Sequence, residues 1–513
     1  MLPDNLGHLF DVPLRLTPQA PAVFQGDTVL TFADLEARTN RVASALRELG
    51  VGAGDRVALM FSNDVKFLEV LFGPMRLGAV AVPLNTRMGD DALRYVVEDA
   101  EASVVIASRA MAERAGALVA GARGVKHLIA DAPAGDGALA YDELTAAASP
   151  ELARRRTDPD EVCMQPYTSG STGKPKGVLL THGGQIWNAD VLRKAILCDP
   201  TERALIAVPL FHKNALAGAV KPFLLAGGSL VILPGFDARE VIRAIERYRV
   251  TYLTGVPAMY TMILAETELL ARHDVGSLRY AVCGSAEVPE ELLEEFRRVF
   301  KAPIAESYGL TEGGPVPITN TRWGLKRRGS CGLEIPGSDV RLVDDEGRDV
   351  PVGQPGELLT RNPGLAKGYW KLPEVTARKL RDGWLSTGDL LRRDADGFYY
   401  FVGRKDDMIN VAGENVYPKE VEDVLLRHPN LRDAAVVPVP HGVKGEVPVA
   451  FVVEREPGRT SEEEVKRFFL ERGAPYAHPR RVMFLDALPL GGTGKLDRNA
   501  LRARARATPS ERP

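Results

Sequence analysis

Residues 167–177, Tyr-Thr-Ser-Gly-Ser-Thr-Gly-Lys-Pro-Lys-Gly, form the stretch of this chain best suited to chemistry. They include three glycines, four serines and threonines, and two lysines. Glycines let backbone N–H groups turn toward an anion without a Cβ in the way, and hydroxyl and ammonium groups add further donors. This composition packs poorly and predicts a loop that binds phosphate.

The alternative interpretation is a flexible, solvated surface loop. Two apolar runs flank the stretch, which a linker would not have. Residues 162–167 predict a short strand, and residues 178–182 begin the next element. A Walker A loop is excluded because Lys174 is followed by Pro175 rather than by serine or threonine. A phosphate loop of another type is therefore expected.

This loop resembles the signature loop of the adenylate-forming superfamily, which includes acyl-CoA synthetases, adenylation domains of peptide synthetases and beetle luciferases. Four more motifs follow in that family's order: residues 308–312 (Tyr-Gly-Leu-Thr-Glu), 386–390 (Ser-Thr-Gly-Asp-Leu), 403–407 (Gly-Arg-Lys-Asp-Asp) and 489–495 (Pro-Leu-Gly-Gly-Thr-Gly-Lys). Five matches in order, over nearly the whole chain, leave little room for chance.

The resemblance implies an ATP site with Mg²⁺ as cofactor. The loop residues that would bind the phosphates are Thr168, Ser169, Gly170, Ser171, Thr172, Gly173 and Lys174. The residues that would contact the adenine and the neighbouring part of the nucleotide are Gly284, Ser285, Ala286, Glu306, Ser307, Tyr308 and Gly309. Thr311 would supply a hydroxyl to the α-phosphate, and Glu312 a carboxylate to Mg²⁺, which prefers oxygen ligands.

The resemblance also assigns the ribose and the reacting carboxylate. Asp389 suits a bidentate contact with two ribose hydroxyls, and Arg404 would assist it. From the residues alone, a turn-forming aspartate after Gly388 is an equally good interpretation of Asp389. Lys495 would bridge the incoming carboxylate and the α-phosphate, and so favour the transition state over the ground state.

The acyl pocket is expected at His212, Lys213, Met259 and Ser307. Residues 209–214 contain no aspartate to pair with an α-amino group, which weakens the peptide-synthetase interpretation. Malonate-activating members have an arginine where this chain has Ser307, so a dicarboxylate is not supported, although Lys213 would pair with a second anion if it points inward.

The resemblance implies a CoA tunnel at Ala412 and Gly413. Ala412 replaces the first glycine of a common Gly-Gly pair, and Ala477 stands where lysine is frequent. The CoA contacts are therefore less firmly assigned than the ATP site.

The surrounding elements predict how these residues are positioned. Thr31 and Asp34 begin a helix of capping-box type, and helices and strands alternate afterwards, which predicts a layered α/β domain. The Ala- and Gly-rich stretch 107–160 is expected to be a surface excursion with short helices. The arginines at 154–156 are expected to form a solvated face rather than a docking site.

The fold class is therefore α/β. We expect a large amino-terminal AMP-binding domain, 1–404, of layered α/β subdomains plus a β-rich subdomain that begins near Gly329. A small, mobile α+β carboxy-terminal domain, 405–505, would pivot near Asp406, and 506–513 would form a tail.

Composition limits the function classes. The chain has 513 residues, 45% of them hydrophobic and 26% charged, with a net charge of −3, which gives no reason to expect a nucleic acid or an anionic membrane as partner. Its four cysteines lack CxxC spacing, and neither a signal peptide nor a membrane span is predicted. A cytoplasmic monomer or homodimer is expected.

The leading hypothesis is an acyl-CoA synthetase for a short- or medium-chain or aryl monocarboxylate. It would form an acyl-adenylate from ATP and transfer the acyl group to CoA, releasing AMP and pyrophosphate. One alternative is a ligase that loads a carrier protein in trans, since no carrier domain follows Lys495. Another is a non-catalytic nucleotide-binding member.

Overall fold

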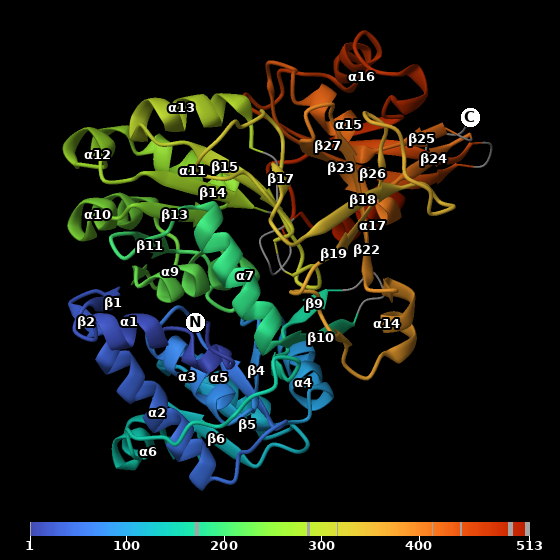
Figure 1. Ribbon diagram of the computed structural model, residues 1–513. Helices are drawn as coiled ribbons and strands as arrows, with labels where there is room; N and C mark the ends of the chain where they lie inside the picture. The colour runs from blue at the N-terminus through green and yellow to red at the C-terminus, as the bar shows by residue number, and fades with distance from the viewer. Residues whose placement is uncertain are drawn as a thin grey trace. The chain divides into compact units, whose positions relative to one another are not determined.

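The computed structural model describes residues 2–169, 174–284, 288–314, 316–412, 414–441, 444–490 and 496–507 (Figure 1). It divides into two compact units: unit 1, Met1–Val340 with Thr360–Ser386, and unit 2, Arg341–Leu359 with Thr387–Pro513. This division groups residues 387–404 with the carboxy-terminal part of the chain. The expected functional boundary near residue 405 stays a prediction.

The first sheet of unit 1 has nine strands in the order β17-β16-β15-β14-β13-β11-β12-β1-β2. The six from β15 to β1 run parallel. Its strands are β1 (Pro21–Gln25), β2 (Thr28–Thr31), β11 (Arg203–Ile206), β12 (Ser229–Ile232), β13 (Tyr252–Gly255), β14 (Tyr280–Gly284), β15 (Ile304–Tyr308), β16 (Ile318–Thr319) and β17 (Leu333–Glu334). The helices near it are α9 (Lys221–Ala226), α10 (Ala238–Tyr248), α11 (Pro257–Ala265), α12 (Thr267–Arg272) and α13 (Glu290–Phe300).

The second sheet of unit 1 has the order β20-β10-β8-β4-β3-β5-β6-β7, with β9 paired to β10. Its strands are β3 (Arg56–Met60), β4 (Val80–Pro83), β5 (Ala102–Ala107), β6 (His127–Ala130), β7 (Leu139–Ala140), β8 (Val162–Met164), β9 (Tyr167–Ser169), β10 (Pro175–Thr181) and β20 (Gly368–Tyr369). The remaining helices of unit 1 are α1 (Asp11–Leu16), α2 (Phe32–Glu48), α3 (Lys66–Arg76), α4 (Asp90–Asp99), α5 (Ala112–Val119), α6 (Tyr141–Ala147), α7 (His182–Ala195), α8 (Lys213–Ala215) and α14 (Pro373–Lys379).

Local sequence explains these elements where it is informative. Every residue of β4 and β12 is buried, as expected for parallel strands covered on both faces. The predicted capping box of α2 is confirmed, since Asp34 N–H donates to Thr31 Oγ1 at 3.1 Å and Thr31 N–H donates to Asp34 Oδ2 at 2.9 Å.

The stretch 107–160 differs from the expected surface excursion. Its strands β6 and β7 extend the second sheet, and Ile129 and Ala130 are buried there. The apolar run in β6 is four residues long, too short to stand out from its Ala-rich surroundings.

The arginines at 154–156 are largely solvated, as expected, since Arg154 and Arg156 are exposed and Arg155 is half-buried; two of them also form ion pairs. Arg154 forms two bonds to the Asp11 carboxylate, at 2.5 and 2.6 Å, and Arg155 pairs with Glu161 at 2.8 Å. These ion pairs hold the segment within unit 1.

Unit 2 contains strands of two further sheets. In the first, β22 (Trp384–Arg393), from Thr387 onward, pairs with β23 (Tyr399–Arg404), and β18 (Asp339–Val343) and β19 (Gly356–Arg361) continue the sheet. The second has the order β25-β24-β27-β26, with β28 beside β27. Its elements are β24 (Ile409–Val411), β25 (Glu414–Val416), α15 (Pro418–Leu425), β26 (Leu431–His441), β27 (Gly445–Glu454), α16 (Glu462–Leu470), β28 (Arg481–Phe484) and α17 (Arg498–Ala507).

Asp406 lies in the short 3₁₀ turn η4 (Lys405–Asp407), between β23 and β24. Its role as a pivot stays a prediction. Within the ranges given above, no helix combines the length and apolar character needed to cross a membrane.

Candidate active site

The predicted phosphate loop joins two strands of a hairpin. β9 and β10 pair antiparallel, with Lys176 opposite Thr168 and Gly177 opposite Tyr167. Lys174 is exposed at the start of the returning strand, with its Nζ 5.2 Å from the ring centroid of Tyr95 on α4. The strand predicted before the loop is therefore present, and the element that follows the loop is a second strand.

The hairpin is anchored at the base of β9. Tyr167 donates its hydroxyl to Asp99 Oδ2 at 2.6 Å and accepts a bond from Gln165 Nε2 at 3.1 Å. Burial and the neighbouring Asp99 carboxylate raise the Tyr167 pKa well above its usual value, so the phenol stays protonated and serves as a fixed donor.

Glu312 lies beside this hairpin. Thr168 Oγ1 is 3.2 Å and the Tyr369 hydroxyl 3.1 Å from the same carboxylate oxygen, Glu312 Oε1. No ion pair joins Glu312 to a lysine, arginine or histidine of the described ranges. The carboxylate predicted to bind Mg²⁺ is thus held by neutral hydroxyls next to the hairpin that flanks the predicted phosphate loop.

Four parallel strands bring the other predicted residues of unit 1 to one sheet edge. The neighbours β11, β13, β14 and β15 all end there, since Gly255 pairs with Cys283 and Gly284 pairs with Ser307. The carboxyl edge of a parallel sheet is the usual position of ligand sites in open α/β folds. Topology alone therefore groups residues that lie up to about a hundred positions apart.

The acyl-pocket prediction involves this edge. Lys213 Nζ donates to the Gly309 carbonyl, so the lysine points toward the motif at 308–312. Thr254 Oγ1 donates to Asn214 Oδ1 at 2.5 Å, which places a second polar side chain at the end of β13. Met259 is buried on α11, which begins just after the same strand.

Glu306 and Tyr308 are buried at 8% and 7% exposure on β15, whereas Ser307 is half-buried between them. Glu306 Oε1 accepts a bond from Val288 N–H at 3.2 Å. Thr311 and Glu312 follow in a turn, both half-buried. Adenine contacts for Glu306 stay a prediction.

In unit 2, Asp389 and Arg404 are directly opposite each other on β22 and β23. The Asp389 side chain is 8% exposed, and its Oδ1 lies 3.1 Å from Arg404 Nη1. The turn-forming interpretation of Asp389 is wrong, because the residue lies in the middle of a ten-residue strand. Cross-strand pairing accounts for the expected association of these two residues.

Ala412 follows β24 with φ of +54°, a left-handed conformation that glycine adopts without a Cβ penalty. The departure from the family glycine therefore falls where the backbone favours glycine.

Several predicted site residues lie outside the described residues: Gly170, Ser171, Thr172, Gly173, Ser285, Ala286, Gly413 and Lys495, together with the side chain of Ser169.

Tyr369 was missed by the sequence analysis. It lies in the two-residue strand β20, 57 positions after Glu312, and neither periodicity nor composition marks it. A strand this short carries no readable pattern, so its pairing with β10 is visible in the tertiary structure alone.

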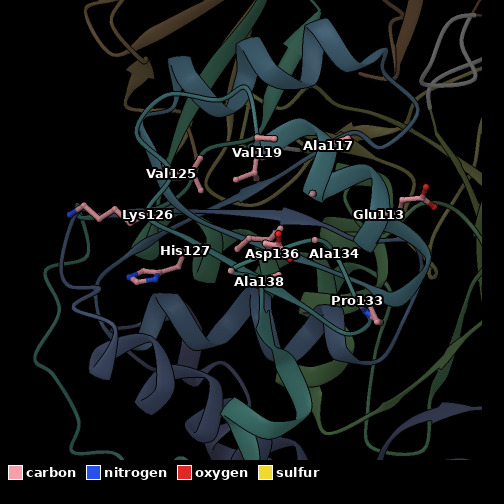
Figure 2. A pocket seen from close by; sticks show the side chains of 15 residues that line it. Glu113, Ala117, Val119, Val125, Lys126, His127, Pro133, Ala134, Asp136 and Ala138 are labelled. Carbon is pink, nitrogen blue, oxygen red and sulfur yellow. The ribbon is translucent and has the colours of Figure 1, made fainter.

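One surface hollow of unit 1 contains none of the predicted site residues. Figure 2 shows this hollow of about 630 Å³ in unit 1, lined by α5, β6 and residues 133–138. Glu113 and Lys126 lie on opposite sides of this view, and Asp136 is near its centre. The hollow lies away from the motifs in the sequence and offers no set of converging donors.

The described side chains fit Mg²⁺ better than a metal held by protein alone. Within the described ranges, no three histidine, cysteine, aspartate or glutamate side chains gather into a metal cage. Mg²⁺ is usually bound by one or two carboxylates together with substrate phosphates. A single oriented glutamate beside the predicted phosphate loop meets that need.

Comparisons with known proteins agree with this geometry. The model of the AMP-binding enzyme family matches residues 10–370, and that of the AMP-binding enzyme C-terminal domain matches residues 420–495. A feruloyl-CoA synthase of Amycolatopsis sp. is 41% identical over 96% of this chain and 97% of its own. An indoleacetate–CoA ligase of Aromatoleum aromaticum is 35% identical, covering 97% of this chain and 98% of its own. The crystal structure of an anthranilate CoA ligase with anthranoyl-AMP superposes with a TM-score of 0.91 at 30% identity, over 99% of this chain and 98% of that chain.

Proposed function

The chain belongs to the family of AMP-binding enzymes and is an AMP-forming acid–thiol ligase that uses ATP, Mg²⁺ and CoA, and from this premise we propose that its acid is an aryl or arylalkenyl monocarboxylate. The observation that carries the proposal is the end-to-end similarity to a feruloyl-CoA synthase. Polar groups at the predicted acyl edge, Lys213, Asn214 and Ser307, also suit a ring with polar substituents better than a long alkyl chain.

The first half-reaction attaches the acid to the nucleotide. The hairpin of β9 and β10 would hold the β- and γ-phosphates through Thr168, Lys174 and the loop between them. Glu312 would hold Mg²⁺, which neutralises phosphate charge when bound. The carboxylate oxygen attacks the α-phosphorus, the bond to the β-phosphate oxygen breaks, and pyrophosphate leaves.

Lys495 is proposed to serve this step alone. Its ammonium would bridge the attacking carboxylate and the α-phosphate, where negative charge concentrates in the transition state. In the second half-reaction the CoA thiol loses its proton and attacks the acyl carbon, and AMP leaves. Asp389, with Arg404 opposite it, would bind the ribose throughout.

A pyrophosphate-release screen tests the proposed substrate class. Purified protein with MgATP is given hydroxycinnamates, benzoates, aliphatic acids of graded length, dicarboxylates and amino acids, each with and without CoA. We expect the highest kcat/KM with a ring-bearing monocarboxylate and product thioester with CoA. A preference for an alkyl acid, a dicarboxylate or an amino acid would overturn the proposal.

A Lys213→Met variant sharpens the test. In the wild type, the Lys213 ammonium donates to the Gly309 carbonyl and lies at the predicted acyl edge. We expect kcat/KM to fall roughly 10-fold more for ring-hydroxylated acids than for their unsubstituted analogues, since one hydrogen bond to a charged group contributes about 1.5–3 kcal/mol. Equal losses for both acids would remove Lys213 from the proposed recognition.

The role of Lys495 is tested by separating the half-reactions. Lys495→Ala should lower adenylate formation roughly 10²-fold or more, the effect of one preorganised charge. The same variant, given synthetic acyl-adenylate and CoA, should form thioester at nearly the wild-type rate.

Asp406→Pro, which restricts φ at the proposed pivot, should impair one half-reaction and spare the other.

A further inference from the structure

Residues 365–370 contact two separate parts of the predicted ATP site within unit 1. Lys367 N–H donates to Leu179 O and Trp370 N–H to Gly177 O, both at 2.8 Å, so this segment borders β10 as it leaves the phosphate loop. Ala366 N–H donates to the Glu312 carbonyl at 2.9 Å. One short stretch of backbone therefore fixes the phosphate hairpin and the Glu312 turn to each other.

The side chain of Tyr369 adds a contact to the carboxylate itself. Its hydroxyl and that of Thr168 both lie within 3.2 Å of Glu312 Oε1. Glu312 Oε2 is outside both contacts. Two donors on one oxygen fix the plane of a carboxylate and direct its second oxygen.

Tyr369 is itself held in place. Its backbone N–H donates to Thr376 Oγ1 at 2.9 Å, and the next residue, Trp370, donates its indole N–H to Asp99 O at 2.8 Å. Asp99 also accepts the Tyr167 hydroxyl at the base of β9. The hydroxyl that reaches Glu312 thus comes from a rigid segment that is linked to the phosphate hairpin.

We propose that Tyr369 is a positioning residue for the metal, which orients Glu312 so that Oε2 is presented to the Mg²⁺ of MgATP. This inference rests on the proposed function for the identity of the ligand. A neutral hydroxyl suits the task because it orients the carboxylate without compensating its charge, whereas a lysine or arginine would compete with the cation. Outer partners of this kind typically change metal affinity or activity 10- to 100-fold when they are removed.

The test measures ATP binding without acid or CoA, by calorimetry, in excess Mg²⁺ and in EDTA. Tyr369→Phe keeps the ring and removes the hydroxyl. We expect the gain in ATP affinity that Mg²⁺ confers to fall roughly 10-fold, with the affinity in EDTA unchanged. Tyr248→Phe is the matched control, because the Tyr248 hydroxyl donates at 2.7 Å to Gly26 O, away from the motifs, and should change neither affinity.

A second variant shows whether Tyr369 acts through Glu312. In a Glu312→Gln background, where we expect the Mg²⁺ advantage to be lost, Tyr369→Phe should change ATP affinity less than 2-fold. Thr168→Val removes the other donor to Oε1, and should reduce the Mg²⁺ advantage even if Tyr369→Phe does not fold.

Three results would overturn the inference. The first is that Tyr369→Phe loses the same amount of ATP affinity with Mg²⁺ as without it. The second is that Tyr369→Phe loses as much ATP affinity in the Glu312→Gln background as in the wild type. The third, which applies if Tyr369→Phe does not fold, is that Thr168→Val leaves the Mg²⁺ advantage unchanged. Failure of the proposed function is a separate observation, namely no acid-dependent pyrophosphate release by the wild type.

Discussion

Glu312 in unit 1 and Asp389 in unit 2 are both carboxylates in nucleotide motifs, yet their surroundings differ. Glu312 is half-buried in a turn and accepts bonds from two neutral hydroxyls, of Thr168 and Tyr369. Asp389 is buried in a strand and pairs with Arg404 at 3.1 Å. One carboxylate keeps its negative charge available, and the other is already compensated by a cation.

This difference matches the ligands proposed for the two sites. A cation is bound by charge, so its carboxylate must be oriented without being neutralised. Ribose hydroxyls are bound by directed hydrogen bonds, and a carboxylate paired with arginine keeps acceptor positions while the pair lowers the cost of burial. The predictions that follow test this contrast, from the largest expected effect to the smallest.

Glu312→Gln should have the largest effect. Glutamine keeps an oxygen for Thr168 and Tyr369 but loses the charge, so we expect adenylate formation to fall roughly 10²-fold or more with the fold retained. Pyrophosphate release in MgATP measures this, with thermal melting as the control for folding. A loss below about 3-fold would mean that the charge of Glu312 is not the feature that matters.

Asp389→Asn should weaken nucleotide binding rather than abolish the reaction. It removes one charge-assisted acceptor and leaves Arg404 without this carboxylate, so KM for ATP should rise roughly 10-fold, as one charged hydrogen bond contributes about 1.5–3 kcal/mol. The Asp389→Asn substitution should reduce the affinity for deoxy-ATP less than the affinity for ATP. The matched control is Asp339→Asn, an exposed partner of Arg361 at 2.8 Å, which should change KM less than 2-fold.

Acid should destabilise the side of the molecule that contains Glu312. His182 begins α7 directly after β10, and its Nδ1 accepts the Leu6 N–H at 2.9 Å. Burial lowers the His182 pKa from 6.5 to about 4. As pH falls from about 6.5 to about 4, His182 is protonated in the unfolded chain but stays neutral in the native protein, so the native protein loses stability over this range.

Urea denaturation at pH 7.5 and pH 5 measures this loss. Between these values His182 should contribute a decrease of about 2 kcal/mol in the free energy of unfolding, which His182→Gln should abolish. His8, whose pKa burial also lowers to about 4, should keep its own share of the decrease in that variant. An identical pH dependence in both proteins would contradict a neutral His182.

Ala412→Gly should have the smallest effect, confined to unit 2. The residue has φ of +54°, so glycine relieves strain while it loses more backbone entropy on folding. We expect a gain of roughly 0.5 kcal/mol in the free energy of unfolding. In contrast, Ala434→Gly in β26 should destabilise by a similar amount, because that strand needs no left-handed residue.

Much of the candidate site was predictable from local sequence. The glycines and hydroxyls of residues 167–177 imply a phosphate loop. The apolar runs imply a short strand before it and a further element after it, where the structure has β8, β9 and β10. The capping box at Thr31 was equally predictable, since such a signal involves neighbours within one turn.

Tertiary structure alone decided which of these parts meet. Arg154 binds Asp11 across 143 positions, Lys213 reaches Gly309 across 96, and Tyr369 reaches Glu312 across 57. Strand order brings such residues together, and a short strand such as β20 has too few residues to show a period. The sequence by itself determined the chemistry of each motif, because residue types and near neighbours carry it, whereas the orientation of Glu312 depended on a partner that long-range packing supplies.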